Sequence, residues 1–131
     1  MTTGKHVIQL EKIGSNLAAD VLLNRKVRTD LIIDTGATDT VISADIARKL
    51  GIDYNRGKTV LCQLADGRSV SGRQVNIREI RIGGARVYNV NAVVLDSGDT
   101  GKDAGLLGMS FLENFIFKVD SEKGVLVLQK R

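Results

Sequence analysis

The sequence has no proline and no tryptophan, and it has single copies of cysteine (Cys62) and histidine (His6). One cysteine excludes an intrachain disulfide bond. One cysteine and one histidine cannot supply the several Cys and His ligands of a structural zinc site. We therefore expect neither a metal site nor another cofactor.

Long apolar runs are also missing. No stretch approaches the roughly 18 apolar residues that a membrane-spanning helix needs, and the first residues are too polar for a signal peptide. The sequence as given predicts a cytoplasmic protein without a membrane segment. If it is a trimmed piece of a membrane-tethered parent, the prediction becomes a periplasmic domain.

The positive charge is modest and dispersed. Nineteen basic and 15 acidic residues give a formal net charge of +4, and the densest basic group is Arg25, Lys26 and Arg28. No aromatic residues are interleaved with it, as a nucleic-acid surface would require. The balance indicates a basic, soluble surface and argues against a nucleic-acid partner.

A length of 131 residues predicts one domain, residues 1–131, with a core of Val, Ile and Leu because aromatic residues make up only 4%. Fourteen glycines and many β-branched residues favour strands and tight turns. We predict an all-β protein with two short helices and a closed, barrel-like sheet. The predicted strands are 6–10, 16–23, 27–33, 59–64, 69–80, 85–95, 117–120 and 125–129, and residues 80–82 lead into a second hairpin with 85–95.

Helical spacing appears twice. Residues 43–50 have Ser43 as a suitable N-cap and Gly51 just beyond the end. Residues 109–115 place Phe111, Leu112 and Phe115 on one face. Each predicted helix follows an apolar run that stops at a glycine loop, which suggests a weak repeat in two halves.

The stretch 31–43 organises the rest of the chain. Its apolar start predicts a buried strand that ends at Asp34, followed at once by Thr35, Gly36 and Ala37. A strand tip holds a reactive group rigidly, and Gly36 permits a close backbone approach. The second apolar run, Leu106-Leu107-Gly108, has no carboxylate at the corresponding place.

One carboxylate cannot act as both acid and base. Two carboxyl groups held close together can, because they share one proton and their pKa values separate. Such a pair can activate a water molecule and protonate the carbonyl that the water attacks. Since this chain provides one such strand tip, its partner would come from a second copy across a two-fold axis.

The run Leu-Ile-Ile-Asp-Thr-Gly-Ala and the later Leu-Leu-Gly resemble the retropepsin-like aspartic peptidases, a single-domain, homodimeric family. The spelling Leu-Leu-Gly-Met is similar to the bacterial and DNA-damage-inducible members. The resemblance implies an aspartic endopeptidase, with Asp34 as its catalytic residue, that acts on peptides or proteins. It assigns the active-site loop to Thr35, Gly36 and Ala37, the flap to Ala65, Asp66, Gly67 and Arg68, the supporting loop to Leu106, Leu107 and Gly108, and the dimer interface to 117–129.

The chain departs from the viral pattern at Thr38, where an acidic residue is usual, and at Met109, where arginine is usual. The ion network of the viral dimer interface is therefore not expected. Two alternatives stay open. The domain could be a retropepsin-like dimerisation or peptide-binding module with little catalysis, or a β-rich interaction domain in which Asp34 is only a turn residue.

Overall fold

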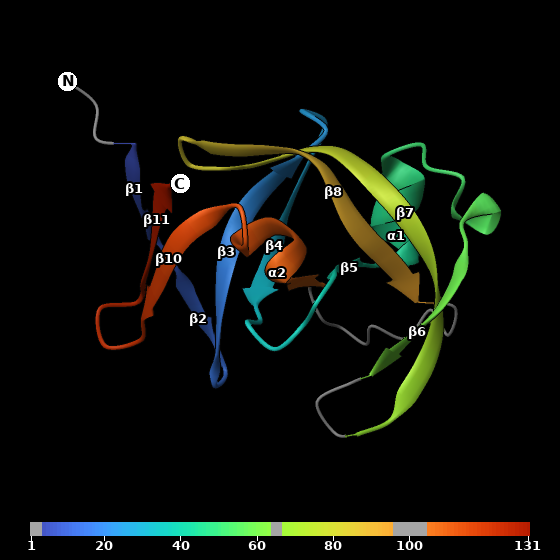
Figure 1. Ribbon diagram of the computed structural model, residues 1–131, viewed down its shortest axis with the longest axis horizontal. Helices are drawn as coiled ribbons and strands as arrows, with labels where there is room; N and C mark the ends of the chain where they lie inside the picture. Colours follow the sequence, from blue (N-terminus) through green and yellow to red (C-terminus); the bar gives the residue numbers. More distant parts are fainter. Residues whose placement is uncertain (1–3, 64–66, 96–104) are drawn as a thin grey trace.

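The computed structural model describes residues 4–63, 67–95 and 105–131. Within these ranges the chain is mostly strand, with two short α-helices and one 3-10 turn (Figure 1). The elements, in chain order, are β1 Lys5–Gln9, β2 Glu11–Ile13, β3 Asn16–Leu23, β4 Val27–Ile33, β5 Thr40–Ile42, α1 Ala44–Lys49, η1 Tyr54–Arg56, β6 Thr59–Gln63, β7 Ser69–Ile82, β8 Ala85–Leu95, β9 Leu106–Leu107, α2 Met109–Leu112, β10 Phe115–Asp120 and β11 Val125–Lys130.

The larger sheet closes on itself. Its strands follow the order β2-β3-β4-β9-β5-β8-β7-β6, and β3 also pairs with β7. The closing pairs are Leu22 with Arg81 and Leu23 with Ile80. This ring-like sheet, with two short helices, confirms the predicted all-β, barrel-like fold.

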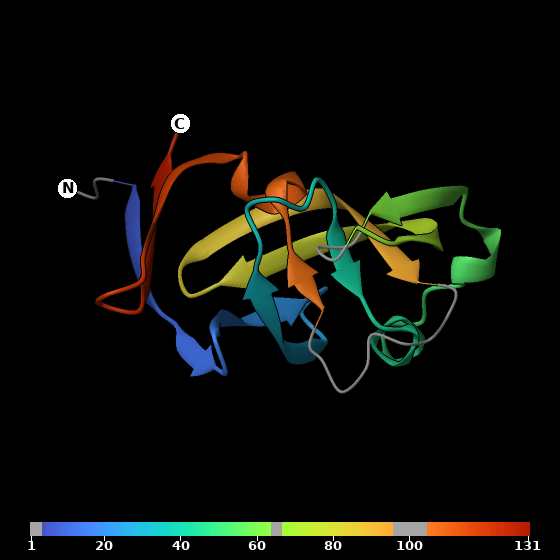
Figure 2. The same cartoon turned by 90° about the horizontal axis from the view of Figure 1, so that it is seen from below.

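The two ends of the chain form a separate three-stranded sheet, β1-β11-β10, at one end of the molecule (Figure 2). Its inner face contributes Ile8, Leu126 and Leu128 to the main core, all at most 9% exposed. Its outer face carries Val7, which is 60% exposed. The predicted last hairpin is confirmed as β10 and β11.

The core is aliphatic, as the composition predicts. Its largest fully buried side chains are one phenylalanine and otherwise leucine, isoleucine and valine. The ring encloses them, so that the inward positions of alternate residues meet at the centre. Burial of this apolar surface stabilises the fold by about 25 cal/mol for each Å² removed from water.

Local chemistry explains where several elements begin and end. Asn24 and Arg25 have φ of 51° and 57°, and the N–H of Lys26 donates to the carbonyl of Leu23 at 2.9 Å. This tight turn joins β3 to β4, as expected of asparagine at a hairpin. At α1, the Ser43 side chain accepts the N–H of Ile46, which confirms the predicted N-cap.

The prediction of a helix over 109–115 is wrong at its C-terminal end. α2 ends at Leu112, and Phe115 is the first residue of β10. The Asn114 side chain donates from Nδ2 to the carbonyls of Ser110 and Phe111, at 3.1 and 3.0 Å. These bonds satisfy carbonyls that a longer helix would use, and the chain then pairs with β11.

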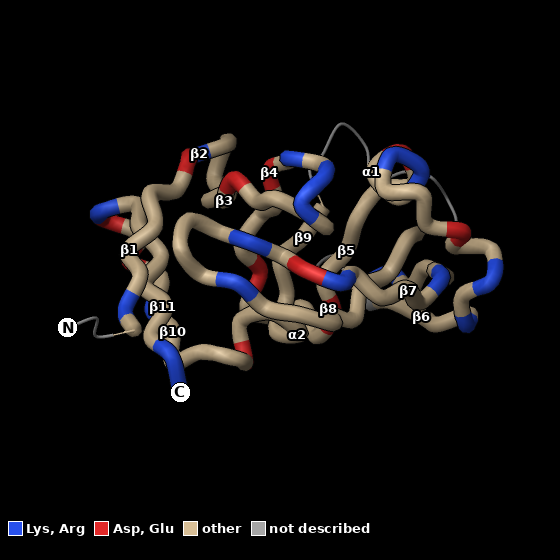
Figure 3. The backbone as a smooth tube through the Cα atoms, turned by 90° about the horizontal axis from the view of Figure 1, so that it is seen from above, with Lys and Arg blue, Asp and Glu red and all other residues tan. Residues whose placement is uncertain are grey.

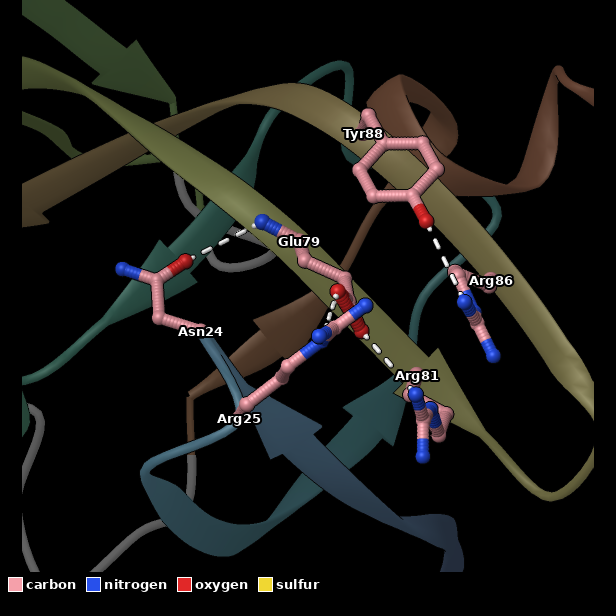
Figure 4. Close-up of polar contacts among 6 residues, drawn as sticks. All are labelled: Asn24, Arg25, Glu79, Arg81, Arg86 and Tyr88. Carbon is pink, nitrogen blue, oxygen red and sulfur yellow. Dashed lines mark hydrogen bonds and ion pairs between the residues drawn. The ribbon is translucent and has the colours of Figure 1, made fainter.

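A buried carboxylate supports the closure of the ring. Glu79 is 5% exposed, and its backbone N–H donates to Asn24 Oδ1 at 3.0 Å. Its Oε1 accepts from Arg25 Nε at 2.8 Å, and its Oε2 lies 3.5 Å from Arg81 Nη2 (Figure 4). The β3–β4 turn is thereby attached to β7 beside the β3–β7 pairs.

Figure 3 shows basic residues spread over several elements, in agreement with the dispersed charge of the sequence.

Candidate active site

Asp34 lies at the end of a strand ladder. β4 runs parallel to β9, with Ile32 opposite Leu106 and Ile33 opposite Leu107. The N–H of Asp34 then donates to the carbonyl of Leu107 at 3.1 Å. The backbone that carries this carboxylate is therefore held by the last hydrogen bond of the ladder, which confirms the predicted strand tip.

The residues after Asp34 form a tight turn around its carboxylate. Asp34 Oδ1 accepts the N–H of Gly36 at 3.0 Å, and the Asp34 carbonyl accepts the N–H of Ala37 at 3.2 Å. A Cβ on Gly36 would lie 3.4 Å from Asp34 Oδ1, in van der Waals contact with the carboxylate. Asp34 and Ala37 are half-buried, whereas Thr35 and Gly36 are exposed. The turn thus orients the carboxylate and presents its own backbone at the surface.

The segment after β9 holds this turn in place through hydrogen bonds. The N–H groups of Met109 and Ser110 donate to the carbonyls of Ala37 and Thr38, each at 2.8 Å. Gly108 makes the approach possible, because a Cβ on it would meet the Ala37 carbonyl oxygen at 2.8 Å and would overlap the carbonyl oxygen of Asp39. The structure therefore brings the two predicted loops, 34–37 and 106–108, into direct contact.

Sequence reasoning missed two residues at this contact, Thr40 and Ser110. Thr40 is fully buried, and its hydroxyl accepts the N–H of Gly108 at 3.2 Å. Ser110 Oγ accepts the N–H of Thr40 at 3.1 Å. The available signal was a polar residue directly before the buried pair Val41-Ile42, but threonine is common in strands and the signal is weak.

The predicted flap is a hairpin formed by β6 and β7, with Gln63 opposite Ser69. Gly67 has φ of 87°, and both Gly67 and Arg68 are exposed. Ala65 and Asp66, which were also assigned to the flap tip, lie outside the described residues. Figure 1 shows the hairpin and the loop after β4 on the same lower side of the molecule.

An apolar cluster lies between the base of this hairpin and the strands that flank the Asp34 loop. Val41 of β5, Val93 and Leu95 are its buried members, and Val60, Cys62, Val70 and Leu106 pack against them. Cys62 is half-buried here. Burial raises the pKa of its thiol, and the negative charge of Asp39 raises that pKa further.

A β-ring with an Asp-Thr-Gly turn at one strand tip, held by a second apolar-Gly loop, is the architecture of a retropepsin-like protein. The chain belongs to the aspartyl protease family, whose pattern matches residues 19–111. That range includes both loops described above. It ends at Phe111, so that α2, β10 and β11 lie partly or wholly beyond it.

Two relatives illustrate the likeness. The crystal structure of a retropepsin-like aspartic protease from Rickettsia conorii is 28% identical and has a TM-score of 0.74, covering 95% of this chain and 89% of that one. An uncharacterized protein of Rickettsia prowazekii (strain Madrid E) is 32% identical over 103 residues, or 78% of this chain. The chain spans 42% of that curated relative's length. No helix within 4–63, 67–95 and 105–131 has the length and apolar character needed to cross a membrane.

Proposed function

We propose that this chain is an aspartic endopeptidase that works as a homodimer, with Asp34 of each copy forming the catalytic pair. The observation that carries the proposal is the asymmetry between the two loops in contact, 34–37 and 106–108. β4 leads to Asp34, whereas β9, its parallel neighbour, leads to Gly108. One chain thus provides one carboxylate at this point, and the chemistry of peptide hydrolysis needs two.

The exposed part of the Asp34 turn is what a second copy would cover. Thr35 and Gly36 are exposed although they adjoin a half-buried carboxylate and the half-buried end of β4. A two-fold axis beside Thr35 would bring the two Asp34 side chains together and let the threonines bond across it. Residues 117–129, which make up most of the β10–β11 hairpin, are the part of the interface that the family resemblance supports.

In the proposed mechanism, one Asp34 carboxylate takes a proton from a water molecule as that water attacks the peptide carbonyl. The other Asp34, protonated, donates its proton to the carbonyl oxygen, and the tetrahedral intermediate then collapses as the leaving nitrogen is protonated. The hairpin with residues 65–68 at its tip would close over the peptide. The apolar cluster beneath it, which includes Val41 and Val60, favours peptides with apolar side chains near the cleaved bond.

The test compares wild type with Asp34→Ala on a peptide library, from about pH 4 to 8 and at several protein concentrations. We expect cleavage by the wild type that rises more than proportionally with concentration, and none by the variant. Matching circular dichroism and thermal melts would show that the variant is folded. Full cleavage by Asp34→Ala would refute the assignment.

Mixing the two proteins tests the shared site directly. After subunit exchange in an equal mixture, about one quarter of the dimers carry two Asp34 residues, so about one quarter of the activity should remain. If each chain acted alone, about one half would remain. A folded dimer that binds peptides but cleaves none under any condition would instead favour the peptide-binding module.

A further inference from the structure

We infer that Thr40 and Ser110 are positioning residues that hold the Asp34 turn in its productive geometry through a one-way chain of hydrogen bonds. The inference rests on the proposed function and deepens it. Thr40 and Glu79 are the two buried polar residues among those described. Glu79 is accounted for by the closure of the ring, whereas Thr40 is buried beside the candidate site.

The direction of each bond in this chain is determined by counting protons. Ser110 Oγ lies 2.8 Å from the carbonyl oxygen of Asn91, which can only accept, so the Ser110 proton points there. Ser110 Oγ and Thr40 Oγ1 are 3.1 Å apart, and the proton between them must therefore come from Thr40. Thr40 Oγ1 in turn accepts from the N–H of Gly108. The order is Gly108 N–H, Thr40 hydroxyl, Ser110 hydroxyl, Asn91 carbonyl.

This chain connects three parts of the fold that are distant in sequence. Thr40 and Ser110 are 70 positions apart, and Asn91 belongs to β8. Because every proton is used in one direction, the loss of either hydroxyl leaves a buried donor or acceptor without its partner. Aligned hydrogen bonds in such a chain also strengthen one another.

The Asp34 turn is attached to the same segment at both of its ends. At its start, the N–H of Asp34 donates to the Leu107 carbonyl, and at its end the N–H of Thr40 donates to Ser110 Oγ. Between these points, Met109 and Ser110 donate to the carbonyls of Ala37 and Thr38. Ser110→Ala removes the bond at the Thr40 N–H, and Thr40→Val removes the bonds of the Thr40 hydroxyl to Gly108 and Ser110. Either change loosens the C-terminal end of the turn while the strand ladder still holds Asp34 itself. The expected result is a misplaced carboxylate in a folded protein.

The experiment measures kcat and KM for Thr40→Val, Thr40→Ser and Ser110→Ala on a peptide that wild type cleaves. Valine has the shape of threonine without the hydroxyl, and serine keeps the hydroxyl. We expect Thr40→Val and Ser110→Ala to lower kcat about 10-fold or more, since small misplacements of catalytic groups are costly, with KM little changed. Thr40→Ser should restore most of kcat. The double variant Thr40→Val with Ser110→Ala should lose little more than either one.

Asn24→Gly is the matched control. It removes a side-chain acceptor from the backbone N–H of Glu79, as Ser110→Ala removes one from the N–H of Thr40. Glycine tolerates the positive φ of Asn24. The control site precedes β4 and Asp34 follows it, so about 20 Å of strand separates them. We expect Asn24→Gly to lower thermal stability while kcat stays at the wild-type value.

Amide hydrogen exchange separates this inference from the proposed function. The N–H groups of Gly36 and Ala37 both donate to Asp34, and they should exchange faster in Thr40→Val but not in Asn24→Gly. If wild type cleaves nothing, the proposed function fails, and the exchange of these two amides still decides the positioning role. Wild-type kcat in folded Thr40→Val, an equal loss of kcat in Asn24→Gly, or unchanged exchange would each overturn the inference.

Discussion

Gly108 is a position where the structure makes a specific demand on the residue type. Its φ of −99° and ψ of −170° are available to any residue, so glycine is not needed there for its backbone conformation. It is needed for space. An added Cβ would overlap the Asp39 carbonyl oxygen and would lie 2.8 Å from that of Ala37. Both are backbone atoms, which cannot rotate aside as the end of a side chain can.

The cost of Gly108→Ala follows from what must move. Separating the two loops to admit a methyl group costs about 2 kcal/mol of strain, as for other overpacked sites. The movement also weakens the bonds from the N–H groups of Gly108, Met109 and Ser110 to the Asp34 loop and Thr40, at about 1 kcal/mol for each bond lost. If one or two of the three are lost, the free energy of unfolding falls by about 3 to 4 kcal/mol.

Urea and thermal unfolding measure this change, at several protein concentrations because association contributes to stability. A loss of this size corresponds to a melting temperature lowered by about 12 °C or more. Gly14→Ala is the control: Gly14 has φ of 62° with open space around it, so only conformational strain of about 1 kcal/mol is expected. Equal losses for the two variants, or a Gly108→Ala protein as stable as wild type, would refute the argument from space.

Three further predictions concern other parts of the fold. Glu79→Ala removes a carboxylate that is 5% exposed, and Arg81 loses its ion-pair partner. Because solvent reaches both arginines that contact Glu79, we expect the free energy of unfolding in urea titrations to fall by about 2 kcal/mol, less than for a fully buried pair. Burial and the charge of Asp39 raise the pKa of the Cys62 thiol, so its alkylation by iodoacetamide should be slow near pH 8 and should accelerate only at higher pH than for a free cysteine; a free-cysteine rate at that pH would contradict this. Ser43→Ala removes the N-cap of α1 and should cost about 1 kcal/mol in the same titrations, and an unchanged urea midpoint would show that the cap contributes nothing.

Several elements could be predicted from sequence because their causes are local. The strands 16–23 and 27–33 have the predicted bounds, since alternation of side chains and the Asn24 turn lie within a few residues of each other. The cap at Ser43 and the positive φ of Gly51 are equally local. The Asp34 motif was recognisable for a similar reason, because a strand tip, a tight turn and a carboxylate occupy consecutive positions.

The end of α2 could not be predicted in the same way. Phe111, Leu112 and Phe115 do have helical spacing, and the rings of Phe111 and Phe115 are 5.5 Å apart. Even so, Phe115 pairs with Lys130 in a sheet. Phe115 could extend the helix by a turn or pair with a strand residue 15 positions later. Strand pairing is the more stable choice, and a short stretch of sequence around Phe115 does not contain that partner.

Local sequence is enough to predict the class of fold, the position of the single strand-tip carboxylate and the turns between the strands. The folded chain shows what local sequence could not predict: β3 pairs with β7 to close the ring, β4 lies parallel to β9, and Thr40 and Ser110 bond across 70 positions. The reason is physical. Local conformation depends on neighbours along the chain, whereas buried hydrogen bonds find their partners only after hydrophobic burial has brought distant segments together.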